Sequence, residues 1–209
     1  MMDVEGTLEA DDGVVEVARV VPHLTFPWAA LPAGPRRWAP TDLSVEVDDG
    51  RLHLVRLTYR TVGDRCVVIA GAAPGVEVDW LAEQLATPLL FAHHRRAGGG
   101  LPPVAIMAAL AGEPVWNGSG VGGWRHGRSG VGERPVRLAH LAEDDGHLLV
   151  AAHGVAEEEV ITLVGTLIPL TADASDSDET ADLHQRHRRA LAQRWWDAPR
   201  VPWTPAERE

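Results

Sequence analysis

The sequence Pro135-Val-Arg-Leu-Ala-His-Leu141 is followed by Glu143-Asp-Asp-Gly146, by His147-Leu-Leu-Val-Ala-Ala-His153, and then by Glu157-Glu-Glu159 before a last apolar run. Two apolar segments of strand length therefore flank an Asp-Gly turn, and apolar residues at helical spacing follow the three glutamates. The pattern predicts a β-hairpin with strands at 135–141 and 147–153. It also predicts an amphipathic helix that begins at Glu157 and ends at Leu167-Ile-Pro169. These are predictions of fold, and they assign no function.

Four further segments have the composition of strands. Residues 14–21 are mostly β-branched and precede Pro22, which predicts a first strand. Residues 43–47, 52–60 and 66–70 predict an antiparallel meander, because Asp48-Asp49-Gly50 separates the first two and residues 62–64 separate the last two. Residues 66–70 are apolar at every position, which indicates a strand in the middle of the sheet.

Two segments besides the one at Glu157 predict helices. Val78, Leu81 and Leu85 recur at helical spacing, and we expect Pro88 to break or kink that helix. Pro102-Pro103 opens an apolar segment that Gly112 closes, which predicts a short buried helix. The predicted class is thus α+β, with an antiparallel sheet of about six strands, two or three helices packed on one face, and a separate C-terminal helix.

The composition bounds the domain organisation. A chain of 209 residues suits one domain of ordinary size, which we place at residues 1–170. Residues 171–180 are rich in Asp, Ala and Ser and predict an acidic linker. Residues 181–209 then predict a C-terminal helix, from Asp182 to Trp196, and an irregular tail.

Charge and composition also exclude some function classes. The formal net charge is −11, which argues against a general affinity for nucleic acid or for an anionic membrane. All 19 basic residues are Arg, a composition typical of a GC-rich bacterial genome. The acidic N-terminus lacks the features of a signal peptide, and no uncharged apolar run is long enough to span a bilayer, so we expect a cytoplasmic protein. The single cysteine, Cys66, cannot form an intramolecular disulfide.

Residues 113–134 are rich in glycine and are the best candidate for a binding loop. Bare backbone approaches a ligand closely, and loops often carry function. The predicted binding residues in this segment are Trp116, Trp124, Arg125, His126 and Arg128. Gly118, Gly120 and Gly123 match the G-x-G-x-x-G spacing, but a preceding strand and a following helix are not predicted there, so we expect no nucleotide and no other cofactor.

The C-terminal helix is the second candidate surface. Arg188, Arg189, Trp195 and Trp196 are of the residue types enriched at interface hot spots. One interpretation is that the helix docks on a protein partner or on a second copy of the chain. The other is that its apolar stripe packs on the same chain and leaves the arginines in solvent. The leading hypothesis from the sequence is a non-enzymatic binding or assembly protein that uses the glycine-rich loop and this helix.

The alternative hypothesis is a small metal-dependent enzyme that uses His126, or His140 together with His153. His140 and His153 lie on the two predicted hairpin strands and would meet across them. Two histidines still need a third ligand, and neither an H-E-x-x-H motif nor a close His/Asp triad is present. We therefore predict no metal site, and we interpret the histidines as solvated or hydrogen bonded.

The order strand, Asp-Gly turn, strand, and then a helix that opens with Glu-Glu-Glu and ends with Leu-Ile-Pro resembles the ends of small α+β domains in actinobacterial regulatory and envelope-stress proteins. These include domains similar to the MucB/RseB sigma-factor regulators. The resemblance covers residues 43–170 in pattern. It implies an α+β regulatory domain, usually outside the membrane, whereas this sequence predicts no export signal. It assigns no functional residue.

Overall fold

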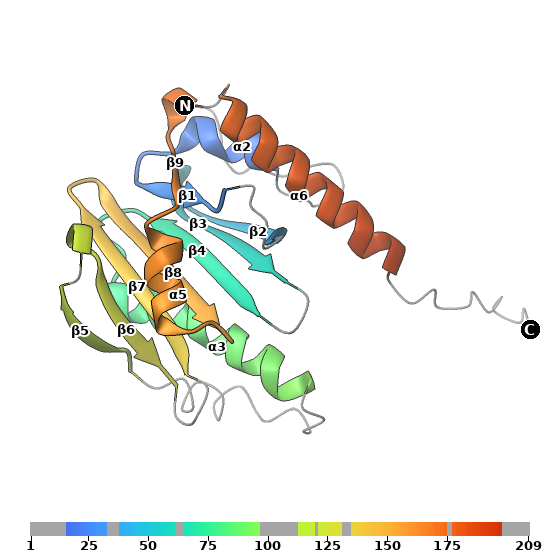
Figure 1. Ribbon diagram of the computed structural model, residues 1–209. Coiled ribbons are helices and arrows are strands. Elements are labelled where there is room, and N and C mark those ends of the chain that lie inside the picture. Colours follow the sequence, from blue (N-terminus) through green and yellow to red (C-terminus); the bar gives the residue numbers. More distant parts are fainter. Residues whose placement is uncertain are drawn as a thin grey trace, which may run out of the picture.

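The computed structural model describes residues 16–32, 38–61, 65–96, 113–119, 121–130, 135–174 and 177–197 (Figure 1). Its centre is a seven-stranded antiparallel sheet with the strand order β2-β3-β4-β8-β7-β6-β5. The strands are β2 (Ala39–Asp48), β3 (Arg51–Arg60), β4 (Cys66–Ala72), β5 (Val115–Ser119), β6 (Arg125–Ser129), β7 (Val136–Glu143) and β8 (Gly146–His153). The predicted α+β class is confirmed, and the sheet has one strand more than expected.

Helices and short 3-10 turns make up most of the remaining described elements. They are the helices α2 (Val17–Val20), α3 (Val78–Arg96), α5 (Glu157–Val164) and α6 (Asp178–Asp197), and the 3-10 turns η1 (Val21–His23), η2 (Val121–Gly123) and η3 (Ala172–Ala174). A second, two-stranded antiparallel sheet pairs β1 (Trp28–Ala30) with β9 (Ile168–Leu170). Figure 1 shows α5 and α3 on opposite faces of the large sheet.

The predicted meander is confirmed as β2, β3 and β4. The turn between β2 and β3 consists of Asp49 and Gly50, whose φ angles of 47° and 68° are both left-handed. A two-residue turn of this kind follows the twist of the strands that it joins, and it requires residues that tolerate positive φ. Every residue of β4 is buried, because β4 lies between β3 and β8 and both of its faces are covered. The central position predicted for this strand is therefore confirmed.

Two apolar cores lie on the two faces of the sheet. The α3-side core joins α3, through residues such as Leu85, to inward residues of four strands, among them Leu54, Val68, Leu138 and Leu149. The α5-side core joins the other face to α2, β1, α5, β9 and α6 through residues that include Val20, Trp28, Tyr59, Ile69, Val150, Val160 and Leu183. Helices therefore pack on both faces, whereas the sequence predicted helices on one face only. Strands buried on both sides have no polar face and lose their period-2 alternation, so their pattern does not say which helix covers which face.

Two predicted elements differ from the structure. The segment predicted as a first strand forms α2 and η1 over residues 17–23, and Val17, Val20 and Val21 are fully buried in the α5-side core. Burial of these side chains at helical spacing overrides their preference for strands. The helix predicted from Glu157 to Pro169 ends at Val164, and residues 168–170 form β9 instead.

Three other predictions about helices have different outcomes. The helix predicted from Val78 is α3, and it continues through Pro88 to Arg96 without ending there. The helix predicted at 102–111 lies outside the described residues. The predicted C-terminal helix is confirmed as α6, which begins at Asp178, inside the stretch predicted as a linker. The division into a domain, a linker and a tail otherwise stays a prediction.

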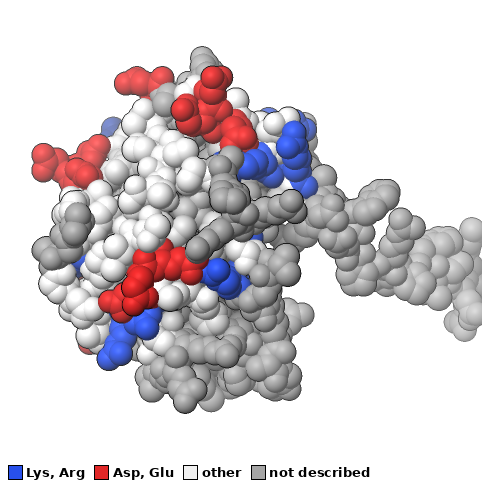
Figure 2. All heavy atoms as spheres, viewed as in Figure 1, with Lys and Arg blue, Asp and Glu red and all other residues white. Residues whose placement is uncertain are grey.

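The acidic first turn of α5 is tied to basic residues at the sheet. Arg137 of β7 donates to Glu157 over 3.3 Å, and Arg65 just before β4 forms an ion pair with Glu159. Carboxylates in the first turn also complement the helix dipole. Figure 2, seen from the side that carries α5, shows the coloured acidic and basic side chains in small separate groups around a broad uncharged surface.

Candidate functional site

The glycine-rich segment forms a β-hairpin rather than the predicted loop. β5 pairs with β6 so that Val115 lies opposite Arg128 and Trp116 lies opposite Gly127, and the register shifts before Ser119 pairs with Arg125. The connection contains η2, where glycines adopt the positive φ angles that the turn requires. The hairpin extends the large sheet, and β5 is its last strand.

The five binding residues predicted in this segment divide between the two faces of the sheet. Trp116 and Arg125 lie on the face that carries α3. Trp116 packs against the α3-side core, and Arg125 pairs with His140, which faces the same side of β7 as Leu138 of that core. Trp124, His126 and Arg128 alternate onto the other face. Trp124 is buried in the α5-side core, and the binding role predicted for it stays a prediction. His126 is half-buried and Arg128 is exposed.

Trp116 is held in place by three contacts. Its Nε1–H donates to Oδ1 of Asp79 in the first turn of α3 over 2.8 Å. The guanidinium carbon of Arg125 lies 4.3 Å from the centroid of the indole ring, a cation–π contact. The ring also approaches His140, with 5.9 Å between ring centroids. Gly127 makes this position possible, because a Cβ on it would lie 2.8 Å from Cε3 of Trp116 and 2.7 Å from the carbonyl oxygen of Val115.

Arg125 begins a chain of hydrogen bonds that ends at His147. Its Nε–H donates to Nδ1 of His140 over 2.8 Å, and Nε2 of His140 lies 3.2 Å from Nδ1 of His147. Because Nδ1 of His140 accepts, neutral His140 carries its proton on Nε2 and donates it to His147. Burial, followed by the charges of Arg125 and His147, lowers the pKa of His140 to about 4, although Asp79 opposes this shift. His140 is therefore a neutral acceptor at physiological pH.

The predicted meeting of His140 and His153 does not occur. The hairpin register places Leu149 opposite His140, and His153 lies four residues further along β8, about 13 Å away. The neighbour of His140 is His147, and their facing ring nitrogens form a hydrogen bond rather than a shared coordination site. Among the described residues, no group of three His, Cys, Asp or Glu side chains is placed to hold a metal ion.

The two edges of the sheet differ in how they are protected. β2 contains Pro40 and two shifts in register, and α6 packs against it. Prolines, bulges and covering helices are the usual features that prevent a sheet edge from pairing with another chain. At the opposite edge, the outer side of β5 pairs with no strand in the described part of the chain. Val115 at the start of β5 has 56% of its surface exposed.

The first half of α6 packs on the body of the protein. Leu183 and His187 are buried, and α6 contacts both β2 and α2. Burial lowers the pKa of His187, although the carboxylate of Asp42 in β2 opposes the shift. For this half, the interpretation that the helix folds back on its own chain is confirmed.

The remaining predicted residues of the helix lie outward or cannot be placed. The Arg188 side chain has 69% of its surface exposed and lies 3.8 Å from Glu16, and Arg189 is exposed. The side chains of Trp195 and Trp196 lie outside the described part of the structure. The binding role predicted for these four residues stays a prediction.

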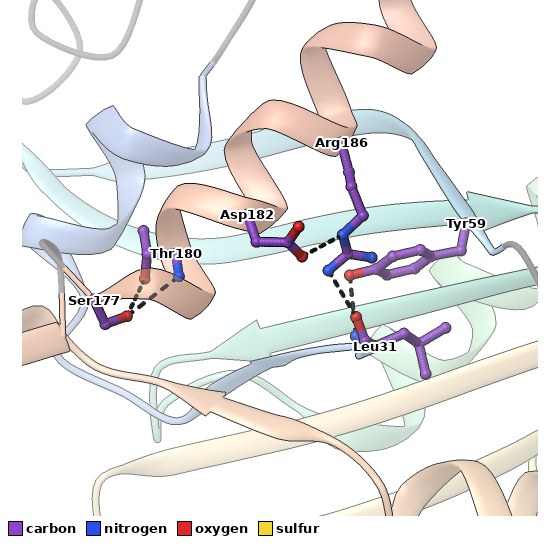
Figure 3. Close-up of polar contacts among 6 residues, drawn as sticks. All are labelled: Leu31, Tyr59, Ser177, Thr180, Asp182 and Arg186. Carbon is purple, nitrogen blue, oxygen red and sulfur yellow. Dashed lines mark hydrogen bonds and ion pairs between the residues drawn. The ribbon is translucent and has the colours of Figure 1, made fainter. Parts of the chain in front are cut away.

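A network of hydrogen bonds fixes the start of α6 to the body (Figure 3). The backbone N–H of Leu31 donates to the hydroxyl of buried Tyr59 over 3.1 Å, and the carbonyl of the same residue accepts from Nη2 of Arg186 over 3.1 Å. Arg186 also donates to Asp182 one turn earlier over 2.7 Å. Ser177 caps the helix, because its Oγ accepts the backbone N–H of Thr180.

A cavity of about 320 Å³ lies beside this network. Its lining consists of Ala30, Pro32, Ile168, Leu170, Asp178, Glu179, Asp182 and Arg186. The acids belong to the first turns of α6, where carboxylates stabilise the helix through its dipole. Among the described lining residues the one cation, Arg186, already pairs with Asp182.

The sequence did not indicate three members of these networks. Nothing in the pattern connected Asp79 to Trp116, which lies 37 residues away. His147 could have been found from the hairpin register, because a turn at residues 144–145 makes it a diagonal neighbour of His140. Tyr59 showed no signal beyond that of an apolar strand residue.

Within the described residues, no helix is long and apolar enough to cross a membrane. Comparison of the chain with models of protein families, with curated proteins and with solved structures found no match.

Proposed function

We propose that this protein is a binding protein that holds a protein partner at the β5 edge of its large sheet, in the cytoplasm. An extended segment of the partner pairs along β5 and places side chains against Trp116 and Arg125. The observation that carries the proposal is an aromatic residue and an arginine held in fixed positions on the last two strands of the sheet, whose outer strand pairs with no further strand in the described part of the chain. Main-chain hydrogen bonds supply affinity in this mode of binding, and neighbouring side chains supply specificity.

Fixed side chains favour binding because less conformational freedom is lost when a partner arrives. Trp116 is anchored by Asp79 and Arg125 is anchored by His140, so both are already ordered in the free protein. Trp and Arg are also the residues that dominate interface energies. Exposed Val115 adds apolar surface at the start of the same strand.

The exposed Arg188 and Arg189 of α6, together with Trp195 and Trp196, form a second contact surface in this proposal. α6 packs against β2, which is the opposite edge of the sheet from β5. A partner that touches both surfaces must therefore span all seven strands. Two different partners, or two copies of the chain, reach the two surfaces without spanning the sheet.

Site-specific crosslinking in the native host tests the β5 proposal. A photoreactive amino acid at Asn117, which is exposed on β5, should trap one defined protein or a second copy of the chain. The same amino acid at Ile161, which has 45% of its surface exposed on α5, is the matched control and should not trap that protein.

A blocking substitution completes the test. Val115→Lys places a charge at the edge, which is a natural means of preventing strand pairing. Because the Val115 side chain is exposed, stability should change by no more than about 0.5 kcal/mol. The crosslink from position 117 should disappear in this variant. An equal yield of crosslink at positions 117 and 161, or a yield that Val115→Lys leaves unchanged, contradicts the proposal.

A further inference from the structure

We propose that His187 is a pH-sensitive contact between α6 and the body of the protein. While its imidazole is neutral, the contact keeps the second half of α6 on β2 and α2, and a proton on the imidazole releases that half. The contact lies at the β2 edge of the large sheet. It is therefore independent of the partner proposed for the β5 edge.

His187 is the last fully buried side chain along α6 in the described part of that helix. It has 2% of its surface exposed. The two residues after it are exposed, and residues 190 and 191 are half-buried. The turns before it are fixed separately, because Ser177 caps the helix and Arg186 donates to the carbonyl of Leu31. Attachment of the helix beyond Arg186 therefore depends on His187.

The surroundings of His187 suit a neutral imidazole. Its Nε2 is buried and forms no hydrogen bond within the described part of the structure. His184, one turn earlier on α6, likewise has a buried Nδ1 without a hydrogen bond among the described residues. A buried cation costs far more free energy than a buried neutral group, unless a counter-charge or an acceptor contacts it. A proton on His187 therefore places a charge in a position built for an uncharged ring.

Charged groups on three elements act on this imidazole. Burial is the largest effect and lowers the pKa of His187, which His184 of α6 lowers further. Asp42 of β2 and Glu16 beside α2 raise this pKa, but they do not reverse the shift. Asp42 is exposed, so solvent screens its charge, and Glu16 lies 3.8 Å from the guanidinium of Arg188. Protonation therefore weakens the contact.

The direction of the pKa shift sets the direction of the pH dependence. An imidazole that has left the surface regains its ordinary pKa of about 6.5. Well above this pH neither state holds the proton, and α6 is held at full strength. As the pH falls below it, the released helix binds a proton that the docked helix does not. The docking constant should then fall by up to about tenfold per pH unit, until docked His187 is protonated too.

Amide hydrogen exchange in the full-length protein tests this contact. Exchange is followed by NMR at about pH 7.5 and about pH 5.5, and the intrinsic rate at each pH is divided by the measured rate to give a protection factor. The protection factors of residues 188–191 should fall by about fivefold to tenfold between the two values, because only the released helix is protonated. At both values they should lie below those of β4, a fully buried strand that opens only with the whole fold.

Three variants separate the proton on His187 from the packing of its side chain. His187→Met keeps a flexible side chain of similar size that does not titrate, and it should abolish the fall in protection. His184→Gln removes the neighbouring imidazole and should preserve the fall. Asp42→Asn removes a carboxylate that favours the charged form, so the fall should continue to lower pH.

Three results would overturn the proposal. Equal protection of residues 188–191 at both pH values means that release of the helix takes up no proton. A fall of the same size in His187→Met assigns the proton to another group. Protection equal to that of β4 at both pH values means that α6 opens only together with the whole fold, so that no separate release occurs.

Discussion

Replacement of Tyr59 by Phe should destabilise the protein through a single lost hydrogen bond. The Tyr59 side chain is fully buried, and its hydroxyl accepts the backbone N–H of Leu31, which is buried as well. Phenylalanine preserves the ring and its packing but supplies no acceptor. The backbone N–H of Leu31, a residue that is 1% exposed, then loses its partner.

The expected loss follows from the cost of an unsatisfied buried donor, which is about 1–3 kcal/mol. For a chain of this length, each kcal/mol lowers the melting temperature by about 2–4 °C. Urea unfolding should therefore show a lower midpoint with an unchanged slope, because the surface exposed on unfolding stays the same. Thr162→Ala is the control, since it deletes an exposed hydroxyl that donates to Glu158, and it should change stability by no more than about 0.5 kcal/mol.

Alkaline titration of the unmodified protein tests the same burial independently. Burial raises the pKa of Tyr59 above its ordinary value, although the Leu31 hydrogen bond and Arg186 partly oppose the shift. The chain has one tyrosine, so tyrosinate absorbance reports this group alone. Stability from this group is complete below the unfolded pKa of about 10 and is lost as pH rises above it, because only the unfolded chain then ionises.

Tyrosinate should therefore form only together with unfolding, as measured by circular dichroism. Formation near pH 10 in the folded protein, or a Tyr59→Phe variant as stable as the parent, would refute the structural reasoning.

Three other substitutions and conditions have definite expected outcomes. Arg186→Ala removes the hydrogen bond to the Leu31 carbonyl and should lower the free energy of unfolding in urea by about 1.5–3 kcal/mol. Arg188→Ala, at a mostly exposed side chain, should lower it by less than about 0.5 kcal/mol. Equal losses would contradict the role of Arg186 in fixing α6 to the body. Gly127→Ala forces a Cβ against the ring of Trp116 and should cost about 1–3 kcal/mol and displace the Trp116 indole N–H signal in NMR; an unmoved signal would show that the ring is not in contact. The depressed pKa of His140 stabilises the fold above about pH 6.5, and that contribution should fall as pH drops toward about 4; His140→Gln should flatten this part of the curve of unfolding free energy against pH.

Much of the sheet was predictable because its turns and periodicity are local. The Asp49-Gly50 turn and the hairpin at residues 144–145 mark the strand ends, and the strands between them alternate or are wholly apolar. β5 and β6 were missed because glycines interrupt and surround them, although Trp116 needs Gly127 opposite it. The segment at 17–23 was misread because tertiary burial decides its conformation.

The candidate site was predictable in its members but not in its arrangement. Trp116 and Arg125 were identified from residue type, whereas their partners Asp79, His140 and His147 come from three other elements. The contacts among them depend on strand order, which no local pattern encodes. The resemblance to MucB/RseB-like domains stays a prediction.

The unequal edges of the large sheet limit how far copies of this chain can associate. Strand addition that joins β5 of one copy to β2 of the next would repeat indefinitely and build a filament. Pro40, the irregular register of β2 and the packing of α6 against that strand all oppose this head-to-tail contact. Pairing of β5 with β5 is symmetric and occupies, in both copies at once, the edge that has no neighbouring strand among the described residues. Self-assembly by this route therefore closes at two copies, which makes the covered β2 edge a safeguard against fibre formation.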